Sequence, residues 1–249
     1  MMMHPQLQQI FDQGRVLKVI SGLNNFDSKR VAAIVKAAER GGASFVDIAA
    51  APDLVKLARE LTNLPICVSA VEPTQFVIAT EAGADLIEIG NFDSFYAQGR
   101  RFEAEEVLAL TRETRSLLPT ITLSVTVPHI LQLDQQVQLA EELVQAGADI
   151  IQTEGGTSSQ PRSAGTLGLI EKAAPTLAAA YEISRAVTVP VLCASGLSNV
   201  TASMAIAAGA KGVGVGSAIN QLNNEVAMVA AVRNLVEALA TVSPNRVRV

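Results

Sequence analysis

Short apolar runs alternate along the chain with longer stretches in which apolar residues recur at helical spacing. Four of the runs follow a glycine and a small residue, and these lie at 42–47, 83–88, 147–152 and 209–214. Three others begin with a proline, at 65–69, 119–124 and 190–195, and one further run at 16–20 precedes them all. Glycine adopts the left-handed backbone that ends a helix, and proline is tolerated at the first residue of a strand. The pattern therefore predicts eight strands.

The stretches between these strands carry the signals of helix starts. Asp27 precedes one periodic run, acidic residues open another at 103–110, and Asp134 and Asn224 precede two more. Side chains of this kind accept hydrogen bonds from the free N–H groups of a first helical turn or favour its dipole. Strands and helices that alternate strictly predict a parallel sheet with right-handed crossovers.

Eight such units in 249 residues average about 31 residues each, the size expected of a closed barrel. We therefore predict an α/β fold, a (β/α)8 TIM barrel that forms a single domain over residues 1–249. A short N-terminal helix near residues 5–13 is expected to close the barrel floor. The alternative is an open, doubly wound sheet, which normally carries a glycine-rich fingerprint after its first strand. Residues 21–25 do not match that fingerprint.

Composition and charge narrow the classes of partner. The chain is 49% hydrophobic and 17% charged, which excludes a disordered protein. A net charge of −5 without a run of Lys or Arg gives no basic surface for nucleic acid, and no apolar stretch approaches the length of a membrane span. The N-terminus has no secretory signal pattern, and Cys67 and Cys193 lie in apolar runs, as reduced core thiols do. We expect no nucleic-acid partner, no membrane and a cytosol-like compartment.

In a barrel of this kind, functional groups lie at the carboxyl ends of the strands. The turns after the seventh and eighth strands both contain glycine and open onto helical segments. Backbone N–H groups in such turns bind anions, and the pair resembles the phosphate sites of the thiazole synthase, indole-glycerol-phosphate synthase and flavin-dependent oxidoreductase barrels. The alternative is that the glycines only let strand eight pack and turn tightly. The predicted phosphate or cofactor contacts are Ser195, Gly196, Ser198, Gly216 and Ser217.

Ionisable residues inside predicted strands form a second candidate group. Because side chains alternate along a strand, Lys18, Asp47 and Glu88 are placed on the face opposite their apolar neighbours, which points into the barrel. Gln152 and Glu154 are expected on the same interior face. A lysine among carboxylates can serve as a Schiff-base amine or proton donor, with a carboxylate as base. The alternative is an ion network without turnover. The predicted catalytic residues are Lys18, Asp47, Glu88 and Glu154.

Two loops supply candidate substrate contacts. The loop after strand four combines aromatic residues with arginines, a pattern that can stack a planar ligand and bind an acid group, or can cover the barrel rim. The long loop after strand six is rich in Gly, Ser and Thr, as lids and simple connections both are. His129 follows strand five and is either an acid/base group or a surface residue. A zinc site lacks ligands. Asp47, Glu88 and Glu154 could hold Mg²⁺, but their spacing does not demand it, so no metal site is predicted. The predicted substrate contacts are Asn91, Arg100, Gln152, Gly155, Gly156, Thr157 and Ser158.

Three segments, 17–26, 91–96 and 152–159, resemble the hypothetical chloroplast reading-frame family "twenty-three" of cyanobacterial and plastid proteins, and the resemblance extends over essentially the whole chain. It implies a TIM-type barrel that works in a cyanobacterial cytoplasm or a plastid stroma. It supplies no reaction, so no catalytic role is carried over from it.

Three functions are compatible with these patterns. The first is an enzyme of lyase, isomerase or aldol type acting on a small phosphorylated metabolite, with Lys18 as amine or acid and Glu154 or Asp47 as base. The second is an oxidoreductase in which the same turns hold the phosphate of FMN. The third is a non-catalytic metabolite-binding or regulatory barrel, and a homo-oligomer is compatible with all three. The fold alone cannot choose among them.

Overall fold

The computed structural model describes residues 5–96, 98–155 and 160–241, and within them it places the strands where the apolar runs predict them. The strands are β1 (Val16–Ile20), β2 (Phe45–Ala49), β3 (Ile66–Ala70), β4 (Leu86–Ile89), β5 (Thr122–Thr126), β6 (Ile150–Gln152), β7 (Val191–Ala194) and β8 (Gly212–Val215). The helices are α1 (Pro5–Asp12), α2 (Ser28–Gly41), α3 (Pro52–Leu61), α4 (Pro73–Glu81), α5 (Asp93–Tyr96), α6 (Ala104–Leu117), α7 (Leu133–Gln145), α8 (Gly165–Ala186), α9 (Ala202–Ala207), α10 (Ser217–Asn220) and α11 (Glu225–Ala240).

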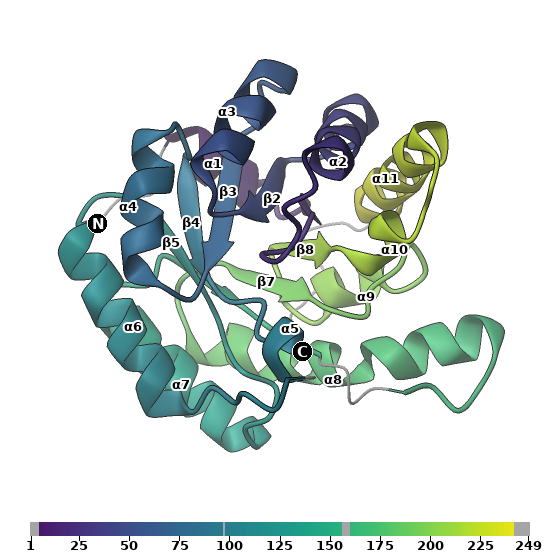
Figure 1. Cartoon of the computed structure of the whole chain (residues 1–249). Helices are drawn as coiled ribbons and strands as arrows, with labels where there is room; N and C mark the ends of the chain where they lie inside the picture. Colours follow the sequence, from purple (N-terminus) through teal and green to yellow (C-terminus); the bar gives the residue numbers. More distant parts are fainter. Residues whose placement is uncertain (1–4, 97, 156–159, 242–249) are drawn as a thin grey trace.

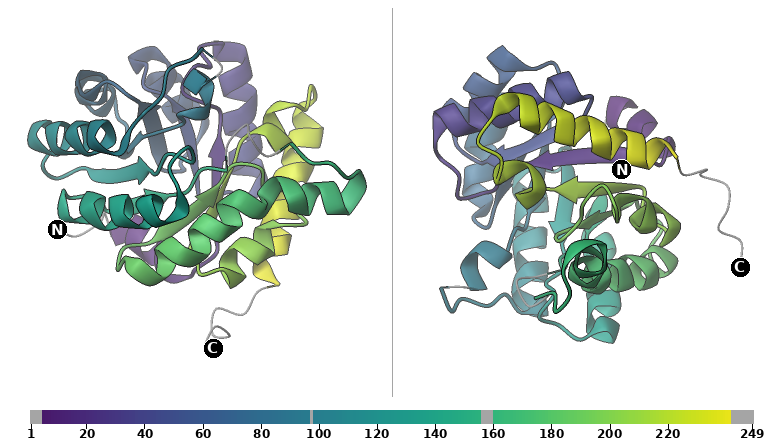
Figure 2. Two further views of the ribbon diagram at one scale, coloured as in Figure 1. Left: turned by 90° about the horizontal axis from the view of Figure 1, so that it is seen from below. Right: turned by 90° about the vertical axis from the view of Figure 1, so that its right-hand side faces the viewer.

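The strands pair in chain order, all parallel, and β8 pairs with β1 to close the barrel. The predicted (β/α)8 barrel is therefore confirmed, and the open doubly wound sheet is wrong. Helices surround the strands (Figure 1), and the two further views show the same ring from below and from the side (Figure 2). The first part of α8 extends beyond the barrel in Figure 1.

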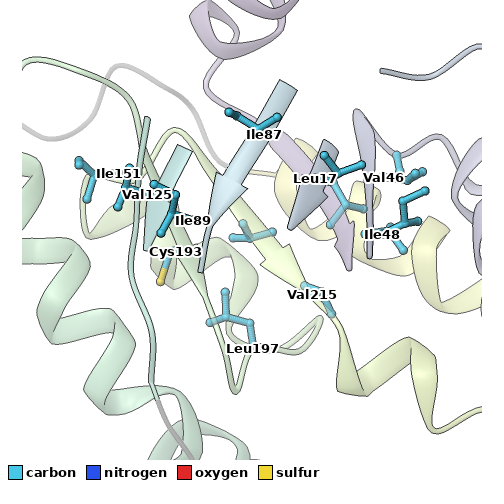
Figure 3. Close-up of a cluster of buried hydrophobic side chains, with 14 of the residues drawn as sticks. Leu17, Val46, Ile48, Ile87, Ile89, Val125, Ile151, Cys193, Leu197 and Val215 are labelled. Atoms are coloured by element: carbon cyan, nitrogen blue, oxygen red, sulfur yellow. The ribbon is translucent and has the colours of Figure 1, made fainter. Parts of the chain in front are cut away.

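Most of the hydrophobic core lies between the strands and the helices. Side chains on the outward face of the strands, such as Leu17, Val46 and Ile87, are fully or almost fully buried against helical residues (Figure 3). A smaller cluster fills the lower interior, where Leu7 and Phe11 of α1 pack on inward side chains that include Phe45. The expected short helix at the floor is thus present, and two of its side chains are part of the buried cluster there.

Local contacts explain the element boundaries. Asp27 and Asn224 accept hydrogen bonds from the first N–H groups of α2 and α11, as predicted. The residue that caps α7 is Gln132 rather than Asp134. Strand β5 begins at Thr122, later than the predicted residue 119, and the Arg115 guanidinium donates to the carbonyls of Leu118 and Ile121 just before it.

The glycines of β8 let this strand pack closely against its neighbours. A Cβ atom on Gly212 would lie 2.3 Å from Cβ of Val16, and one on Gly214 would lie 2.9 Å from Cβ of Ala194. Tight packing therefore explains these two glycines without any ligand. Gly216 differs, because its nearest neighbour would be 3.4 Å from an added Cβ, an ordinary contact. Within the described residues, no helix is long and apolar enough to cross a lipid bilayer.

Candidate functional site

A cavity of about 410 Å³ opens at the carboxyl end of the barrel. Its lining comes from the ends of β1, β4, β5, β6, β7 and β8 and from α8. It contains seven of the predicted site residues, namely Asn91, Gln152, Glu154, Ser195, Gly196, Gly216 and Ser217. It also contains residues that the sequence did not single out, namely Ile20, Asp93, Thr126, Thr153, Lys172, Ala194, Leu197, Gly214 and Val215.

The turns after β7 and β8 present unused backbone donors to this cavity. Within the described residues, the N–H groups of Gly196, Leu197, Gly216 and Ser217 donate no hydrogen bond. All four residues line the same cavity, so neighbouring side chains do not seal the two turns off. Unpaired N–H groups that converge on one space form a site for an oxyanion.

The backbone of the β7 turn is held in an uncommon conformation. Ser195 and Gly196 have φ angles of 75° and 72°, in the left-handed region. Left-handed backbone costs a serine free energy and is retained mainly at functional sites. A Cβ atom on Gly196 would lie 2.7 Å from the Lys172 carbonyl oxygen, so only glycine fits there. Lys172 also lines the cavity.

Lys18, Asp47 and Glu88 meet inside the barrel, as the alternation of side chains predicts. Lys18 Nζ lies 2.6 Å from Glu88 Oε2 and 3.4 Å from Asp47 Oδ2, and it donates to Gln152 Oε1 at 3.1 Å. Ser124 and Ser69 donate to the two carboxylates. None of the three charged side chains is exposed, and none lines the cavity. The group is a closed and almost fully hydrogen-bonded ion cluster.

The charges of this cluster fix its protonation states. Burial by itself lowers the pKa of Lys18, but the carboxylates of Asp47 and Glu88 outweigh it and raise that pKa above its usual value. Burial raises the pKa of Asp47 to about 6, although the Lys18 ammonium acts in the opposite direction. A Schiff base requires a neutral amine that the substrate can reach. Lys18 is charged and enclosed, so this geometry favours a structural and electrostatic role for it.

Gln152 and Asn91 separate the closed cluster from the cavity. Gln152 Nε2 donates to Glu88 Oε1 at 2.8 Å, and Asn91 Nδ2 lies 3.4 Å from Asp47 Oδ2 and 3.5 Å from Glu88 Oε1. Both residues also line the cavity. Asn91 has a φ of 62°, in the left-handed region that asparagine tolerates better than most residues. These two amides therefore form the polar floor of the site.

Glu154 does not join Lys18; it belongs to a second cluster above the floor. Strand β6 ends at Gln152, and Glu154 lies beyond it, beside groups from two other loops. His129 Nδ1 lies 3.0 Å from Glu154 Oε2 and 3.5 Å from Asp93 Oδ1. The Asp93 N–H donates to Glu154 Oε1 at 2.9 Å, and the Tyr96 hydroxyl donates to Glu154 Oε2 at 3.2 Å. Asp93 and Glu154 both face the cavity.

Electrostatics distinguishes the groups of this second cluster. Burial lowers the pKa of His129, but the hydrogen bond and the charge of Glu154 outweigh it, so that the pKa is raised overall. Burial, followed by the charge of Glu154, raises the pKa of Tyr96 and keeps its hydroxyl protonated as a donor. This second cluster, called the open cluster below, thus combines the carboxylates of Asp93 and Glu154, the imidazole of His129 and the phenol of Tyr96 at the edge of the cavity.

Other predicted contacts lie elsewhere. Arg100 does not line the cavity; its exposed guanidinium pairs with Glu106 and packs over the ring of Phe102. The Ser198 N–H donates to Thr201 at the start of α9. Gly155 packs between Thr176 and Ser195, just behind the lining. Gly156, Thr157 and Ser158 lie outside the described residues.

The aromatic residues after β4 pack against one another. Phe92 and Phe102 are fully buried, and their rings stack with centroids 4.4 Å apart. Phe95 meets the edge of Phe102. None of these three rings lines the cavity.

Two comparisons with known sequences identify the family. A family model described as "Protein of unknown function (DUF561)" matches residues 2–245. The chain belongs to the DUF561 family. DUF561 relatives include the Ycf23 protein of Cyanophora paradoxa, which is 46% identical over 240 residues that cover 96% of this chain and 97% of the relative. The Ycf23 protein of Porphyra purpurea is 39% identical over 231 residues, 93% of this chain and 87% of the relative. The resemblance to the reading-frame "twenty-three" family is confirmed.

Several solved structures similar to this DUF561 chain have phosphorylated compounds in their names. The (S)-3-O-geranylgeranylglyceryl phosphate synthase of Thermoplasma acidophilum, in complex with sn-glycerol-1-phosphate, aligns with a TM-score of 0.64 at 15% identity over 97% of this chain and 100% of that one. A 3-hexulose-6-phosphate synthase aligns with a TM-score of 0.63 at 16% identity over 90% and 99%. The thiamine phosphate pyrophosphorylase of Pyrococcus furiosus gives 0.60 at 18% over 92% and 96%. At these identities the likeness concerns the fold.

Proposed function

We propose that this DUF561 chain binds a small phosphorylated metabolite and is an enzyme of lyase, isomerase or aldol type. The observation that carries the proposal is the pair of turns after β7 and β8, whose unpaired N–H groups line one cavity. Such donors match the oxygens of a phosphate, and glycine allows the phosphate to approach the backbone closely. Structural neighbours named for phosphorylated compounds support the same class of ligand.

The reacting part of the metabolite would lie at the other side of the cavity, beside Asp93 and Glu154. Ser195 Oγ donates to Asp93 Oδ2 at 3.3 Å, so the phosphate turn and the open cluster are in direct contact. A carboxylate supported by an imidazole can take up and return the proton that lyases, isomerases and aldolases move. In this proposal Glu154, positioned by His129 and Tyr96, replaces Lys18 as the group that meets the substrate.

The closed cluster would not contact the substrate; it would orient the residues that form the floor of the cavity. Its charge orients the amides of Gln152 and Asn91, which contact both the cluster and the cavity.

The cellular compartment proposed for the protein is a cyanobacterial cytoplasm or a plastid stroma, as the Ycf23 relatives favour.

Matched pairs of phosphorylated and unphosphorylated small metabolites test this function. Calorimetry should show binding of some phosphorylated members and none of their dephosphorylated partners, and incubation should show that a bound compound is converted. Glu154→Gln should retain binding and lose conversion by about 100-fold or more, the usual contribution of an acid/base group. Equal binding of both members of each pair would contradict the phosphate site, and tight binding without conversion would favour the regulatory barrel.

A further inference from the structure

Asp93, His129 and Glu154 have the geometry of three ligands around one absent ion. Each offers one ligand atom, and the three atoms lie within 4.8 Å of one another. His129 Nδ1 is 3.0 Å from Glu154 Oε2 and 3.5 Å from Asp93 Oδ1. Ligand atoms about 2.1 Å from a small divalent cation are roughly 3.0–3.4 Å apart when they share an edge of an octahedron or a tetrahedron. The His129–Glu154 separation lies in that range, and the His129–Asp93 separation is about 0.1 Å longer than its upper limit.

The ligand atoms come from three different loops and are held by further contacts. Asp93 begins α5, His129 follows β5, and Glu154 follows β6. The Tyr96 hydroxyl and the backbone N–H of Asp93 donate to the two oxygens of Glu154, and Ser195 Oγ donates to Asp93 Oδ2. Hydrogen bonds to ligating carboxylates orient them toward the ion and are typical of built metal sites.

A second observation, outside this cluster, points to a cation. The neighbouring turns present unpaired N–H groups for an anion, and Ser195 connects them directly to Asp93. A phosphate bound there lies beside two carboxylates, one of which, Glu154, has a side chain only 4% exposed. Like charges at such distances repel strongly where water is scarce. A divalent cation between the carboxylates and the phosphate removes the repulsion and gives both a common partner.

The closed cluster offers no equivalent site. Its two carboxylates, Asp47 and Glu88, share the Lys18 ammonium, receive hydroxyl donors, and lie away from the cavity. An ion would have to displace a buried ammonium to bind there. The open cluster instead borders space in which a substrate oxygen and water can complete the coordination.

We propose that Asp93, His129 and Glu154 bind one divalent cation of the Mn²⁺ type, and that an oxygen of the phosphorylated substrate completes its coordination. Two carboxylates favour a hard ion and the imidazole favours a transition metal, a combination that Mn²⁺ satisfies. The inference rests on the proposed function for the position of the phosphate. The cation would add to that function by polarising the substrate beside Glu154.

The test uses the full-length protein after treatment with EDTA and dialysis, with Mn²⁺ alone as the first probe. Electron paramagnetic resonance of free Mn²⁺ should reveal one saturable site per chain. His129→Gln and Glu154→Gln should each weaken Mn²⁺ binding by about 10-fold or more, as loss of a ligand does. Glu105→Gln, which removes an exposed carboxylate on α6, serves as the matched control and should bind as the wild type does. Circular dichroism confirms that each variant is folded.

Inorganic phosphate, titrated into the same samples with and without Mn²⁺, separates this inference from the proposed function. We expect Mn²⁺ to raise the affinity of the wild type for phosphate by several-fold and to leave that of Glu154→Gln unchanged. Phosphate binding without any saturable Mn²⁺ site would overturn the cation site and leave the phosphate site intact. Mn²⁺ binding that depends on Glu154, with no phosphate binding, would support the cation site and contradict the proposed function. Equal Mn²⁺ binding by Glu154→Gln and Glu105→Gln would also overturn the inference.

Discussion

The barrel contains two clusters that each combine two carboxylates with one basic group, and they differ in what surrounds them. In the lower one, Lys18 lies between Asp47 and Glu88 and every charged side chain is enclosed. In the upper one, Asp93 and Glu154 flank His129 and both carboxylates face a cavity. Similar sets of charged groups therefore have different roles in the two clusters. The closed set orders the interior, and the open set is available to a ligand.

The largest effect that separates the two clusters is expected from removing their basic groups. Lys18→Met leaves two buried carboxylates without their counter-charge and should lower the free energy of unfolding by about 3–5 kcal/mol. His129→Gln keeps a polar side chain beside a partly open site and should cost about 1 kcal/mol or less. Urea unfolding of both variants measures the difference. Similar losses for the two variants would show that the clusters are not distinct in this way.

The pH dependence of stability is the next largest difference. Because burial raises the pKa of Asp47 from 3.8 to about 6, the folded protein binds a proton that the unfolded chain has released. The resulting stabilisation is full below pH 3.8 and is lost as the pH rises through about 6. The shift corresponds to roughly 2–3 kcal/mol.

Asp47→Asn isolates this contribution, since it removes the titrating group and leaves the other carboxylates in place. The unfolding free energy of the wild type relative to the variant should fall between about pH 4 and about pH 7. A difference that stays constant over this interval would mean that Asp47 titrates as an ordinary carboxyl group does.

Substitution of Asn91, which lies between the clusters, should lower stability by a smaller amount. The loss has two separable causes, the lost side-chain contacts and the backbone conformation. Asn91→Ala loses contacts to Asp47 and Glu88 and places alanine at a φ of 62°, so a cost of about 1–2 kcal/mol is expected. Asn91→Gly relieves the backbone part only. Thermal unfolding should therefore place the glycine variant between alanine and wild type. A glycine variant less stable than the alanine variant would contradict a backbone role at this position.

Arg100 is the control for the comparison and should give the smallest effect. Its ion pair with Glu106 is exposed, and such pairs contribute about 0–1 kcal/mol. Arg100→Ala should leave both the unfolding free energy and phosphate affinity close to those of the wild type in urea titration and calorimetry. A large loss of phosphate affinity would show that Arg100 contributes to the phosphate site.

The closed cluster was predictable because strand periodicity alone determines it. Counting in twos along β1, β2 and β4 places Lys18, Asp47 and Glu88 on the inner face, and the structure brings them together there. The same counting does not reveal which groups Glu154 contacts. Strand β6 ends at Gln152, and Glu154, which also lines the cavity, lies beyond the strand beside His129 and Asp93 instead of Lys18.

The open cluster depends on loops, which have no periodicity to read. Asp93 reaches the site because Asn91 adopts a left-handed backbone just before α5, and His129 reaches it through the turn after β5. Lys172 reaches the cavity because α8 begins well before it and runs past the β7 turn. The turns after β7 and β8 were predictable, since glycines at strand ends mark them. Which of their N–H groups stay unpaired required coordinates.

Phosphate binding at the last two turns is the central claim, and Gly216 offers the most direct measurement of it. A Cβ atom fits at Gly216 without displacing a neighbour, so Gly216→Asp and Gly216→Asn, which are similar in size and differ in charge, are both expected to fold. Calorimetric titration with inorganic phosphate should show binding by the wild type, and a loss for the aspartate variant that exceeds the loss for the asparagine variant by about 10-fold or more. Absence of phosphate binding by the wild type, or equal losses for the two variants, would contradict the account.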